Sequence, residues 1–436
     1  MQDQQPIVDR LNLARTILIY GLGIEGESSL AYFRKHYPEA RISIYDQNNP
    51  KYSKTRNLKN FDCVVVSPGV DRKKLEFKDG QFVTSNSELF FGLLPIEAHT
   101  KILAVTGTKG KSTTVKFLYE LLVHLGFSVE VGGNYGLAML GILEEIDSLD
   151  YVVLEFSSFQ LENLKASPHF AGFVNLYEDH LDRHGSMSEY FAAKANIFKY
   201  QKSDDKLFLP YNYDTFLEPA RSIFTAMVND GESRVVVTEP VPAEYFLEHS
   251  ILRAGHIRAN LGIVAEMVRL LTPNLADSES QIQAFCQIFE PLPHRLEFVA
   301  EIGGKTFIND SQSTNQYSTI AGMQAFGERL GTLILGGKDK GNRYDLLIDE
   351  LLKLHPFVIL LNTEVGNKVK ELLEKTGFEH YVIVNDFASA VELGYQFTEP
   401  GKICLMSPAG ASFDWFVNYK DRGDQFKALV FALESK

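Results

Sequence analysis

Two glycine-rich turns constrain the fold of this chain more than any other feature. Each follows a short apolar run and leads into a helical pattern: IYGLGIEGESS at residues 19–29 and AVTGTKGKSTT at residues 104–114. A strand, a glycine-rich turn and a helix in that order begin a strand–helix–strand unit, whose strands lie parallel in a sheet. Because helix N-termini attract anions, both turns are predicted to bind phosphate groups.

Strands and helices alternate along the whole chain, so we predict an α/β protein with parallel sheets. The expected strands are residues 16–20, 41–46, 61–66, 102–105, 151–154, 170–174, 332–335, 357–361, 381–384 and 403–406, with a hairpin at 297–309. Turn-rich Pro95–Thr100 and the Pro291-Leu292-Pro293 segment are the expected boundaries. The predicted domains are a Rossmann-like domain (1–98), a central P-loop ATPase-like domain (99–296) and a C-terminal Rossmann-like domain (297–436).

Composition narrows the class of protein. The hydrophobic share of 45% and charged share of 23% are those of a soluble globular protein. No apolar run approaches the ~20 residues of a membrane helix, and no signal peptide is visible. Three scattered cysteines (Cys63, Cys286 and Cys404) have no metal spacing and are expected to be buried. A net charge of −13 disfavours nucleic acid. We therefore expect a cytoplasmic monomer with no nucleic-acid or membrane partner.

The first turn has the GxGxxG pattern of dinucleotide-binding domains. Its glycines are Gly21, Gly23 and Gly26, and Asp46 ends the next apolar run 20 residues later. By itself this pattern indicates a nicotinamide-dependent oxidoreductase. Such an enzyme has no use for a second phosphate-binding turn, so the pattern leaves the function open.

The second turn is the stronger chemical signal. It reads Gly107-Thr108-Lys109-Gly110-Lys111-Ser112-Thr113, with Val105 in place of the first glycine of the strict GxxxxGK[ST] pattern. Curled backbone N–H groups cradle phosphate, Lys111 reaches the β- and γ-phosphate oxygens, and the Ser112 hydroxyl binds Mg²⁺. We interpret this turn as an ATP site.

Carboxylate and imidazole groups follow two further strands. Glu155 ends a strand expected to lie beside the phosphate-turn strand, where a carboxylate is well placed for the nucleotide's Mg²⁺. His180, in the segment NLYEDHLDRH after another strand, is a candidate metal ligand. A helix lysine, Lys194, follows and is by itself an ordinary solvated side chain.

These segments resemble the Mur ligases, the ATP-dependent amide-forming enzymes of peptidoglycan precursor synthesis. The resemblance covers essentially the whole chain and rests on eight segments in the family's order: GTKGKST, EFSSFQLE, EDHLDRH followed by AAKANIF, AGHIRAN, LPHRLE, INDSQSTN, LGGKDKG and MSPAGASFDWF. FSSFQL and SPAGASFDWF point, within the family, to members that add D-glutamate to UDP-N-acetylmuramoyl-L-alanine. The resemblance implies that the first domain binds the UDP-sugar, not NAD, through Ile24, Glu25, Asp46, Gly69 and Asn134.

The resemblance also implies a mechanism. The alanine carboxylate attacks the γ-phosphorus of ATP, and the glutamate amine then attacks the resulting acyl phosphate. Two Mg²⁺ ions and Lys111 neutralise the meeting anions. Ser112 and Glu155 are the implied ligands of one ion, and His180 of the second. Lys194 corresponds to a lysine carbamylated by CO₂.

The remaining implied site residues come from matching segments. His256 and Asn260 lie near the adenine, Arg295 reaches the γ-phosphate and Asp310 meets the ribose. The incoming glutamate is surrounded by Thr314, Lys340, Ser412 and Tyr419.

Four residues depart from the family pattern: Lys109 for Asn, Ile257 for Asn, Gln312 for Lys, and Gly410 for Cys. Gln312 removes a charge near the ATP or glutamate subsite, so L-glutamate or another amino acid stays open as the substrate. A nicotinamide-dependent oxidoreductase and a non-catalytic nucleotide-binding relative are the alternatives from other classes.

Overall fold

The computed structural model describes residues 5–54, 57–214, 224, 234–247, 250–273, 275, 277–339 and 341–434. The chain divides into two compact units, which are described separately. Unit 1 contains residues 1–245 and 256–289, and unit 2 contains residues 246–255 and 290–436. The division of the chain into three domains at residues 98 and 296 stays a prediction.

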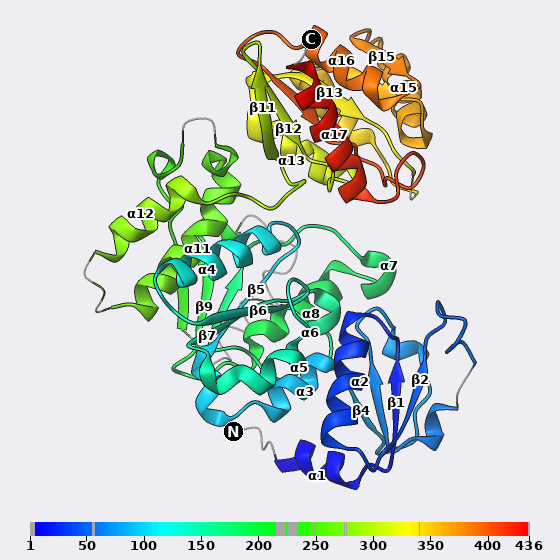
Figure 1. The fold of residues 1–436 in the computed structure, drawn as a ribbon, viewed down its shortest axis with the longest axis vertical. Coiled ribbons are helices and arrows are strands. Elements are labelled where there is room, and N and C mark those ends of the chain that lie inside the picture. Colours follow the sequence, from blue (N-terminus) through cyan, green and yellow to red (C-terminus); the bar gives the residue numbers. More distant parts are fainter. Residues whose placement is uncertain are drawn as a thin grey trace. The chain divides into compact units, whose positions relative to one another are not determined.

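The N-terminal sheet of unit 1 has four parallel strands in the order β2-β1-β3-β4. Its elements, blue in Figure 1, are α1 (Gln5–Leu13), β1 (Thr16–Tyr20), α2 (Ile24–His36), β2 (Arg41–Tyr45), β3 (Cys63–Val66), β4 (Phe82–Thr84) and α3 (Asn86–Leu93). Strands β1 and β3 are apolar almost throughout because helices and loops cover both faces of a parallel sheet. The sequence predicts β1, β2 and β3 but not the three-residue β4.

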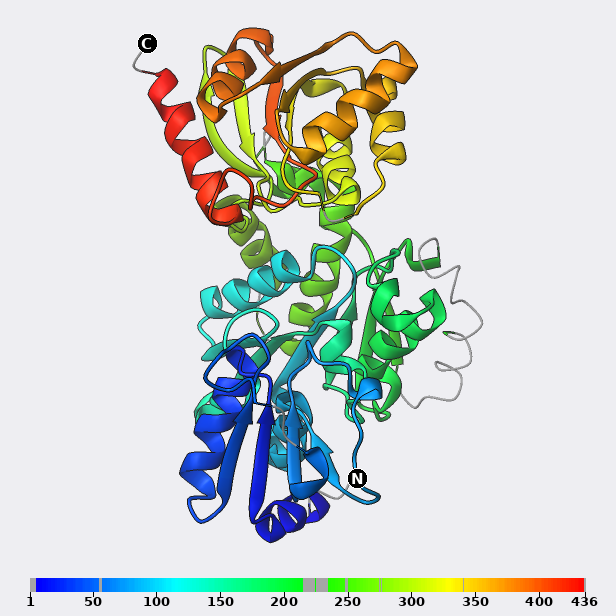
Figure 2. The same cartoon turned by 90° about the vertical axis from the view of Figure 1, so that its right-hand side faces the viewer.

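The central sheet of unit 1 has six parallel strands in the order β10-β9-β8-β5-β7-β6. The strands are β5 (Ile102–Thr106), β6 (Val129–Gly133), β7 (Tyr151–Glu155), β8 (Phe170–Phe173), β9 (Lys206–Pro210) and β10 (Arg234–Thr238). The helices are α4 (Lys111–His124), α5 (Met139–Ile142), α6 (Ser158–Leu161), α7 (Leu181–His184), α8 (Met187–Lys199), α11 (Gly255–Leu271) and α12 (Ser278–Ile288). Figure 2 shows helices on both sides of this sheet.

One hydrophobic core joins the two sheets of unit 1. It contains Ile17 and Phe33 of the first sheet layer together with Ala104 and Leu154 of the second. Helix α5 packs against both α2 and α3. The Asn86 side chain accepts a hydrogen bond from the Leu140 backbone N–H at 3.2 Å. The glycine-rich turns of both sheets therefore belong to a single packed body.

Unit 2 is a six-stranded sheet in the order β11-β12-β16-β13-β14-β15, in which only the β11–β12 pair is antiparallel. Its strands are β11 (Glu297–Ile302), β12 (Lys305–Asn309), β13 (Leu330–Leu335), β14 (Phe357–Leu361), β15 (Tyr381–Val384) and β16 (Ile403–Met406). Its helices are α13 (Gln316–Phe326), α14 (Asp345–Leu354), α15 (Glu364–Thr376), α16 (Phe387–Phe397) and α17 (Tyr419–Leu433). The predicted hairpin and the four predicted strands are confirmed.

Both faces of the unit 2 sheet are buried. Along β13, Leu333 and Leu335 belong to one apolar cluster, whereas Ile334 between them belongs to the other. This alternation follows from the two-residue side-chain period of a strand. Side-chain caps begin two of the covering helices: Asn315 accepts from the Ser318 backbone N–H, and Thr363 from that of Gly366.

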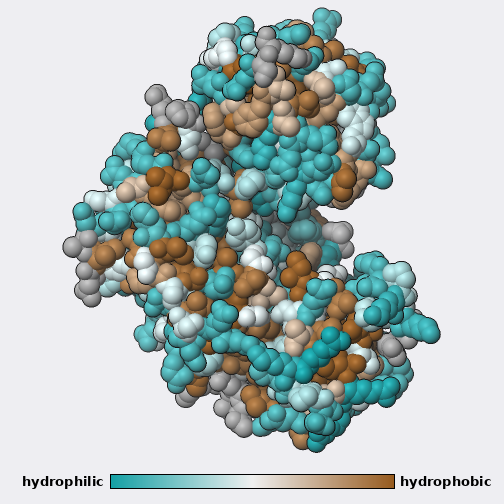
Figure 3. All heavy atoms as spheres, in the orientation of Figure 1, coloured by the Kyte–Doolittle hydropathy of each residue, from teal (hydrophilic) through white to brown (hydrophobic). Residues whose placement is uncertain are grey.

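The burial of the cysteines and the distribution of surface side chains can be compared with the composition. All three cysteines are buried, as predicted. Hydrophilic and hydrophobic side chains are interspersed on the face drawn in Figure 3. Among the described residues, no helix combines the length and apolar character needed to cross a bilayer.

Candidate active site

The turn after β5 has the backbone of a phosphate-binding loop. Gly107 and Gly110 have φ values of +156° and +81°. A Cβ atom at Gly107 would lie 2.4 Å from Val174 Cγ2, and one at Gly110 would lie 2.5 Å from Asn260 Nδ2. Only glycine fits these positions. Helix α4 begins at the next residue, Lys111, so its free backbone N–H groups stand at the turn.

Asn175 holds this turn in shape. It lies just beyond β8, the strand beside β5. Its side-chain oxygen accepts hydrogen bonds from the backbone N–H groups of Thr108 (3.1 Å) and Lys109 (2.9 Å). Its side-chain nitrogen donates to the Lys109 carbonyl oxygen at 2.8 Å. Three bonds from one buried amide fix the turn before any ligand binds.

Three lysines surround the turn. Lys194 Nζ, fully buried in α8, donates to the Gly107 carbonyl at 2.7 Å. Lys111 Nζ donates to the Thr108 carbonyl at 3.0 Å. Lys109 Nζ lies 3.4 Å from a carboxylate oxygen of Asp179. Burial, reinforced by the positive charge of Lys111, holds the pKa of Lys194 well below its usual range. Burial and Lys111 therefore both favour the neutral form of the Lys194 amine at the turn.

Glu155 provides an oxygen ligand beside the turn. Strand β7 pairs with β5, as predicted, and brings the buried Glu155 to the same edge of the sheet. Its Oε1 accepts a hydrogen bond from Asn134 Nδ2 at 2.6 Å, whereas its Oε2 is buried with no hydrogen-bond partner. Ser112 lies buried in the first turn of α4. A buried carboxylate oxygen without a donor is suited to a hard cation.

His180 stands apart from this carboxylate. It precedes α7 in a left-handed conformation, with φ at +55°, and is exposed. Its Nε2 lies 3.9 Å from an Asp179 oxygen, and its ring lies edge-on to Phe159 with centroids 4.9 Å apart. In the described part of the chain, no hydrogen bond or ion pair joins His180 to Glu155 or Lys194.

Helix α11 brings one of the two predicted adenine residues, Asn260, to the same turn. Asn260 is buried, with its amide against Gly110. His256, one helical turn earlier, is exposed. The departure Ile257 lies between them, and no contact in the structure accounts for it.

The first glycine-rich turn is closed by Asp46. Its Oδ2 accepts a hydrogen bond from the Leu22 backbone N–H at 2.6 Å, and its Oδ1 accepts from the Asn48 N–H at 2.8 Å. These backbone donors hold the pKa of Asp46 below its usual value. Ile24 begins α2 and is 76% exposed. The apolar Ile24 side chain is therefore available to a ligand at this turn.

Glu25 is directed into the protein. Gln160 Nε2 of α6 donates to its Oε1 at 2.6 Å, and its Oε2 is buried with no hydrogen-bond partner. Burial raises the pKa of Glu25 to about 7, against the opposing effect of the Gln160 bond. The backbone of Glu25, more than its side chain, is thus available at the first turn.

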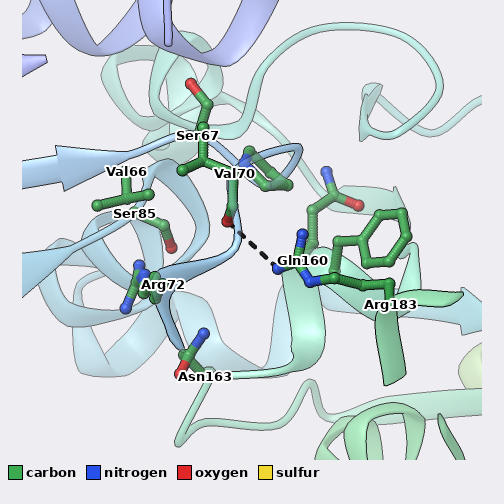
Figure 4. Close-up of a pocket in the computed structure, with 10 residues that line it drawn as sticks. Val66, Ser67, Val70, Arg72, Ser85, Gln160, Asn163 and Arg183 are labelled. Carbon is green, nitrogen blue, oxygen red and sulfur yellow. Dashed lines mark hydrogen bonds between the residues drawn. The ribbon is translucent and has the colours of Figure 1, made fainter. Parts of the chain in front are cut away.

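A small cavity lies at the end of β3 (Figure 4). It is lined by Val66, Ser67, Pro68, Val70, Arg72, Ser85, Phe159, Gln160, Asn163 and Arg183. Arg183 spans it: its Nη2 donates to the Val70 carbonyl at 3.2 Å and to Glu162 at 3.0 Å. Gly69 lies exposed between two lining residues. Both arginines of the lining are paired with carboxylates, Arg72 with Glu88 and Arg183 with Glu162.

In unit 2, Asp310 is buried within a hydrogen-bond network. It accepts from Ser407 Oγ at 2.7 Å and from the Leu296 backbone N–H at 3.2 Å. Burial raises its pKa to about 6. Arg295 Nε donates to Gln312 Oε1 at 2.5 Å. A lysine at position 312, as in the family pattern, would place a second cation against Arg295.

Buried Arg422 ties together two segments that border predicted glutamate residues, at Ser311 and Gly410. It donates to Ser311 Oγ at 3.0 Å and, through two nitrogens, to the Gly410 carbonyl at 3.1 Å. A Cβ at Gly410 would lie 2.7 Å from Val365 Cγ2, which accounts for glycine there. Ser412 follows, buried. Burial lowers the pKa of Arg422 to about 10.

The other predicted glutamate residues lie at helix starts. Thr314 precedes the cap of α13, and Tyr419 begins α17 with its carbonyl accepting from Ser311 Oγ at 2.7 Å. Lys340 lies outside the described residues.

The segment that forms the phosphate turn matches a known protein family, and most of the chain is similar to known enzymes. Residues 105–236, which include the turn, Asn175 and Lys194, match the Mur ligase middle domain. The UDP-N-acetylmuramoylalanine–D-glutamate ligase of Acetivibrio thermocellus is 33% identical over 87% of this chain and 84% of its own. The enzyme of that name from Geotalea uraniireducens is 35% identical over 86% and 84%. This chain belongs to the Mur ligase family.

Solved structures agree with the fold of a Mur ligase. The UDP-N-acetylmuramate–alanine ligase of Thermotoga maritima covers 97% of this chain at 15% identity, with a TM-score of 0.51. A folylpolyglutamate synthase of Mycobacterium tuberculosis, complexed with ADP, covers 79% of it at 12% identity and a TM-score of 0.57. Both solved proteins therefore share the α/β fold of this chain. The ligase family membership removes the support for an oxidoreductase.

Several residues that shape this Mur ligase site were not predicted from the sequence. Asn175, Gln160 and Arg183 each hold a predicted site residue or line the cavity, and Arg422 holds Gly410, two residues before Ser412. Asn175 carried a usable signal, because it follows a strand beside the phosphate-turn strand. Arg422 carried none, because an arginine in a helix is usually solvated.

Proposed function

We propose that this chain is an ATP-dependent ligase that joins D-glutamate to UDP-N-acetylmuramoyl-L-alanine in cytoplasmic peptidoglycan precursor synthesis, acting as a monomer. Its similarity to UDP-N-acetylmuramoylalanine–D-glutamate ligases, over 84% of their length, supports the proposed substrates. The observation that carries the chemistry is the convergence of Lys111, Lys194 and the unpartnered Glu155 oxygen at one edge of the central sheet.

The reaction has two displacement steps. A carboxylate oxygen of the alanine attacks the γ-phosphorus, and the bond to the β-phosphate oxygen breaks, releasing ADP. The glutamate amine then attacks the acyl carbon, loses a proton, and inorganic phosphate leaves. Both steps bring anions together, so positive charge and dipoles placed beforehand do most of the work.

The turn from Gly107 to Lys111 supplies this charge. The N–H groups of the first turn of α4 hold the phosphates, and the Lys111 ammonium neutralises charge on the transferring group. Thr108, Lys109, Gly110 and Thr113 complete the loop. Asn175 contributes by keeping the turn ordered, so that no conformational entropy is lost when ATP binds.

The chain has a donor set that fits Mg²⁺. Glu155 Oε2 is buried without a donor, and Ser112 lies in the first turn of the adjacent helix α4. Hard oxygen ligands of this kind are those Mg²⁺ prefers. Magnesium there would draw charge from the phosphate oxygens. His180 is the proposed ligand of a second ion, by analogy with the family pattern.

Lys194 fits the proposed carbamate. Carbamylation forms a bond from the lysine nitrogen to CO₂ and releases one proton, so it requires a neutral amine. Burial and Lys111 favour that neutral form. The nitrogen keeps one hydrogen after the reaction, which can still donate to the Gly107 carbonyl. The product would give the site a further anionic oxygen ligand for Mg²⁺.

The first turn and the cavity of Figure 4 are the proposed UDP-sugar site. The helix N-terminus at Ile24 and Glu25 faces the diphosphate. Asp46 shapes the turn, and Gly69 and Asn134 border the path of the sugar. The raised pKa of Glu25 keeps a negative charge away from the diphosphate below about pH 7.

The remaining assignments rest on the family pattern. His256 and Asn260 are proposed for the adenine, and Arg295 and Asp310 for the γ-phosphate and ribose. The proposed residues for the incoming amino acid are Thr314, Lys340, Ser412 and Tyr419.

Phosphate release with single substrates omitted tests the proposal. We expect release only with ATP, Mg²⁺, UDP-N-acetylmuramoyl-L-alanine and D-glutamate together. Hydroxylamine in place of the amino acid should trap the acyl phosphate as a hydroxamate that mass spectrometry detects. Phosphate release without the UDP-sugar, or no hydroxamate, would contradict the proposed route.

A further inference from the structure

A second group of polar side chains lies at the amino edge of the central sheet. His99 belongs to the 3-10 helix η3 (Ile96–Lys101), which leads into β5. His169 immediately precedes β8, and Asp205 immediately precedes β9. Because β9, β8 and β5 are neighbours and parallel, their amino ends lie together. This edge is opposite the carboxyl edge that carries Gly107 and Glu155, so the group is separate from the proposed active site.

The three side chains converge on one oxygen atom. Asp205 Oδ1 lies 2.8 Å from His169 Nδ1 and 3.1 Å from His99 Nε2. The three ligand atoms all lie within 4.8 Å of one another. Asp205 is buried, and its Oδ2 accepts a hydrogen bond from the Lys202 backbone N–H at 2.8 Å. That bond fixes the carboxylate, as outer partners do for metal-bound carboxylates.

The geometry points to a divalent transition-metal site, with Zn²⁺ as the best-matched ion, formed by His99, His169 and Asp205. Imidazole nitrogen suits Zn²⁺ and its neighbours, whereas Mg²⁺ prefers oxygen ligands. Tetrahedral bonds of about 2.0–2.1 Å place ligand atoms about 3.4 Å apart. The two histidine–aspartate separations, 2.8 and 3.1 Å, lie close to that value, and the separation of the two histidine nitrogens is at most 4.8 Å. Three protein ligands leave the fourth position to water.

The bound ion would fasten η3 to the sheet. Residues 95–100 are a predicted domain boundary, and η3 leads from α3, beside the first sheet, into β5. His99 is the ligand from this segment, whereas His169 and Asp205 come from the strand starts. Replacing two hydrogen bonds by two metal bonds would tie the segment more firmly to β8 and β9. Because the group is separate from the proposed active site, its occupancy should change the stability of the fold more than ligase turnover.

Zinc titration of the metal-free full-length protein tests this inference. Isothermal titration calorimetry should detect a Zn²⁺ site in the wild type that His99→Ala and Asp205→Asn weaken by at least about 100-fold, since even outer partners contribute 10–100-fold. A hundredfold excess of Zn²⁺ over its dissociation constant should raise the wild-type melting temperature by roughly 3 °C. Mg²⁺ at the same concentration should not reproduce this rise.

Two controls keep the test decisive. His124→Ala removes an exposed histidine at the far end of α4 and should leave Zn²⁺ binding unchanged. His99→Ala is the mildest ligand change because that side chain is partly exposed, and circular dichroism checks that the variant folds. Equal Zn²⁺ affinity and stoichiometry in the wild type and His99→Ala would overturn the inference, as would absence of Zn²⁺ binding to the wild type.

Discussion

Asn175→Ala should loosen the ATP turn more than it harms the rest of the fold. The substitution removes three hydrogen bonds to Thr108 and Lys109. Thr108 N–H keeps a second partner, the Asn175 backbone carbonyl at 3.1 Å, but both Lys109 backbone groups lose this amide. At about 1 kcal/mol per bond, the free energy of unfolding should fall by about 2–3 kcal/mol.

The expected change in KM for ATP follows from the conformational entropy of the turn. A loosened turn has to be ordered again when the phosphates bind, and fixing one residue costs about 1–2 kcal/mol. Since 1.4 kcal/mol is a factor of ten, KM for ATP should rise roughly tenfold. KM for the UDP-sugar should change little. Urea unfolding followed by circular dichroism and steady-state phosphate release measure the two effects.

Asn196→Ala is the matched control. Asn196 is also a buried asparagine of unit 1, and its amide donates to the Leu161 and Glu162 carbonyls at 2.8 and 3.3 Å. Its loss should lower stability by about 1–2 kcal/mol without changing KM for ATP. If both variants raise KM for ATP equally, or if Asn175→Ala leaves it unchanged, then Asn175 does not hold the turn in the shape that binds ATP.

Three further outcomes are expected. Lys194→Ala should be nearly inactive in phosphate release yet partly restored by acetate or propionate, which replace a carbamate; a fully active variant would contradict its role. Asp46→Ala should raise KM for the UDP-sugar and leave KM for ATP nearly unchanged, and the reverse pattern in steady-state kinetics would refute the assignment. Glu25 has a pKa of about 7 in the fold against 4.5 when unfolded, so its ionisation destabilises the fold as pH rises through that window. Glu25→Gln should therefore gain up to about 3 kcal/mol on the wild type between pH 4.5 and 7 in urea unfolding, whereas exposed Glu27→Gln should not; parallel curves for both variants would refute this.

The sequence was informative where local pattern and chemistry coincide. Apolar strands that end in glycine turns predict β1 and β5, and the position of Glu155 on a strand beside β5 follows from parallel pairing. Strand β6 escaped prediction because its sequence VEVGG combines a charge with two glycines. A three-residue strand such as β4 is too short for any period to show.

Side-chain environments could not be predicted in the same way. Lys194 reads as a solvated helix residue, and only the packing of α8 against the turn buries its amine. Glu25 lies in the first phosphate turn, yet its carboxyl group meets Gln160, 135 residues later. His99, His169 and Asp205 have no metal-ligand spacing, because sheet order and not chain proximity brings them together.

The identity of the incoming amino acid most needs a direct test, because Gln312 stands where the family pattern has a lysine. Phosphate release with UDP-N-acetylmuramoyl-L-alanine, ATP and either D- or L-glutamate, measured side by side, addresses it directly. With both carboxylates held, inversion of the α-carbon misplaces the amine, and a displacement of about 1 Å costs about 100-fold in rate. We expect a rate at least about 100-fold higher with D-glutamate. Equal rates, or a higher rate with L-glutamate, would contradict it.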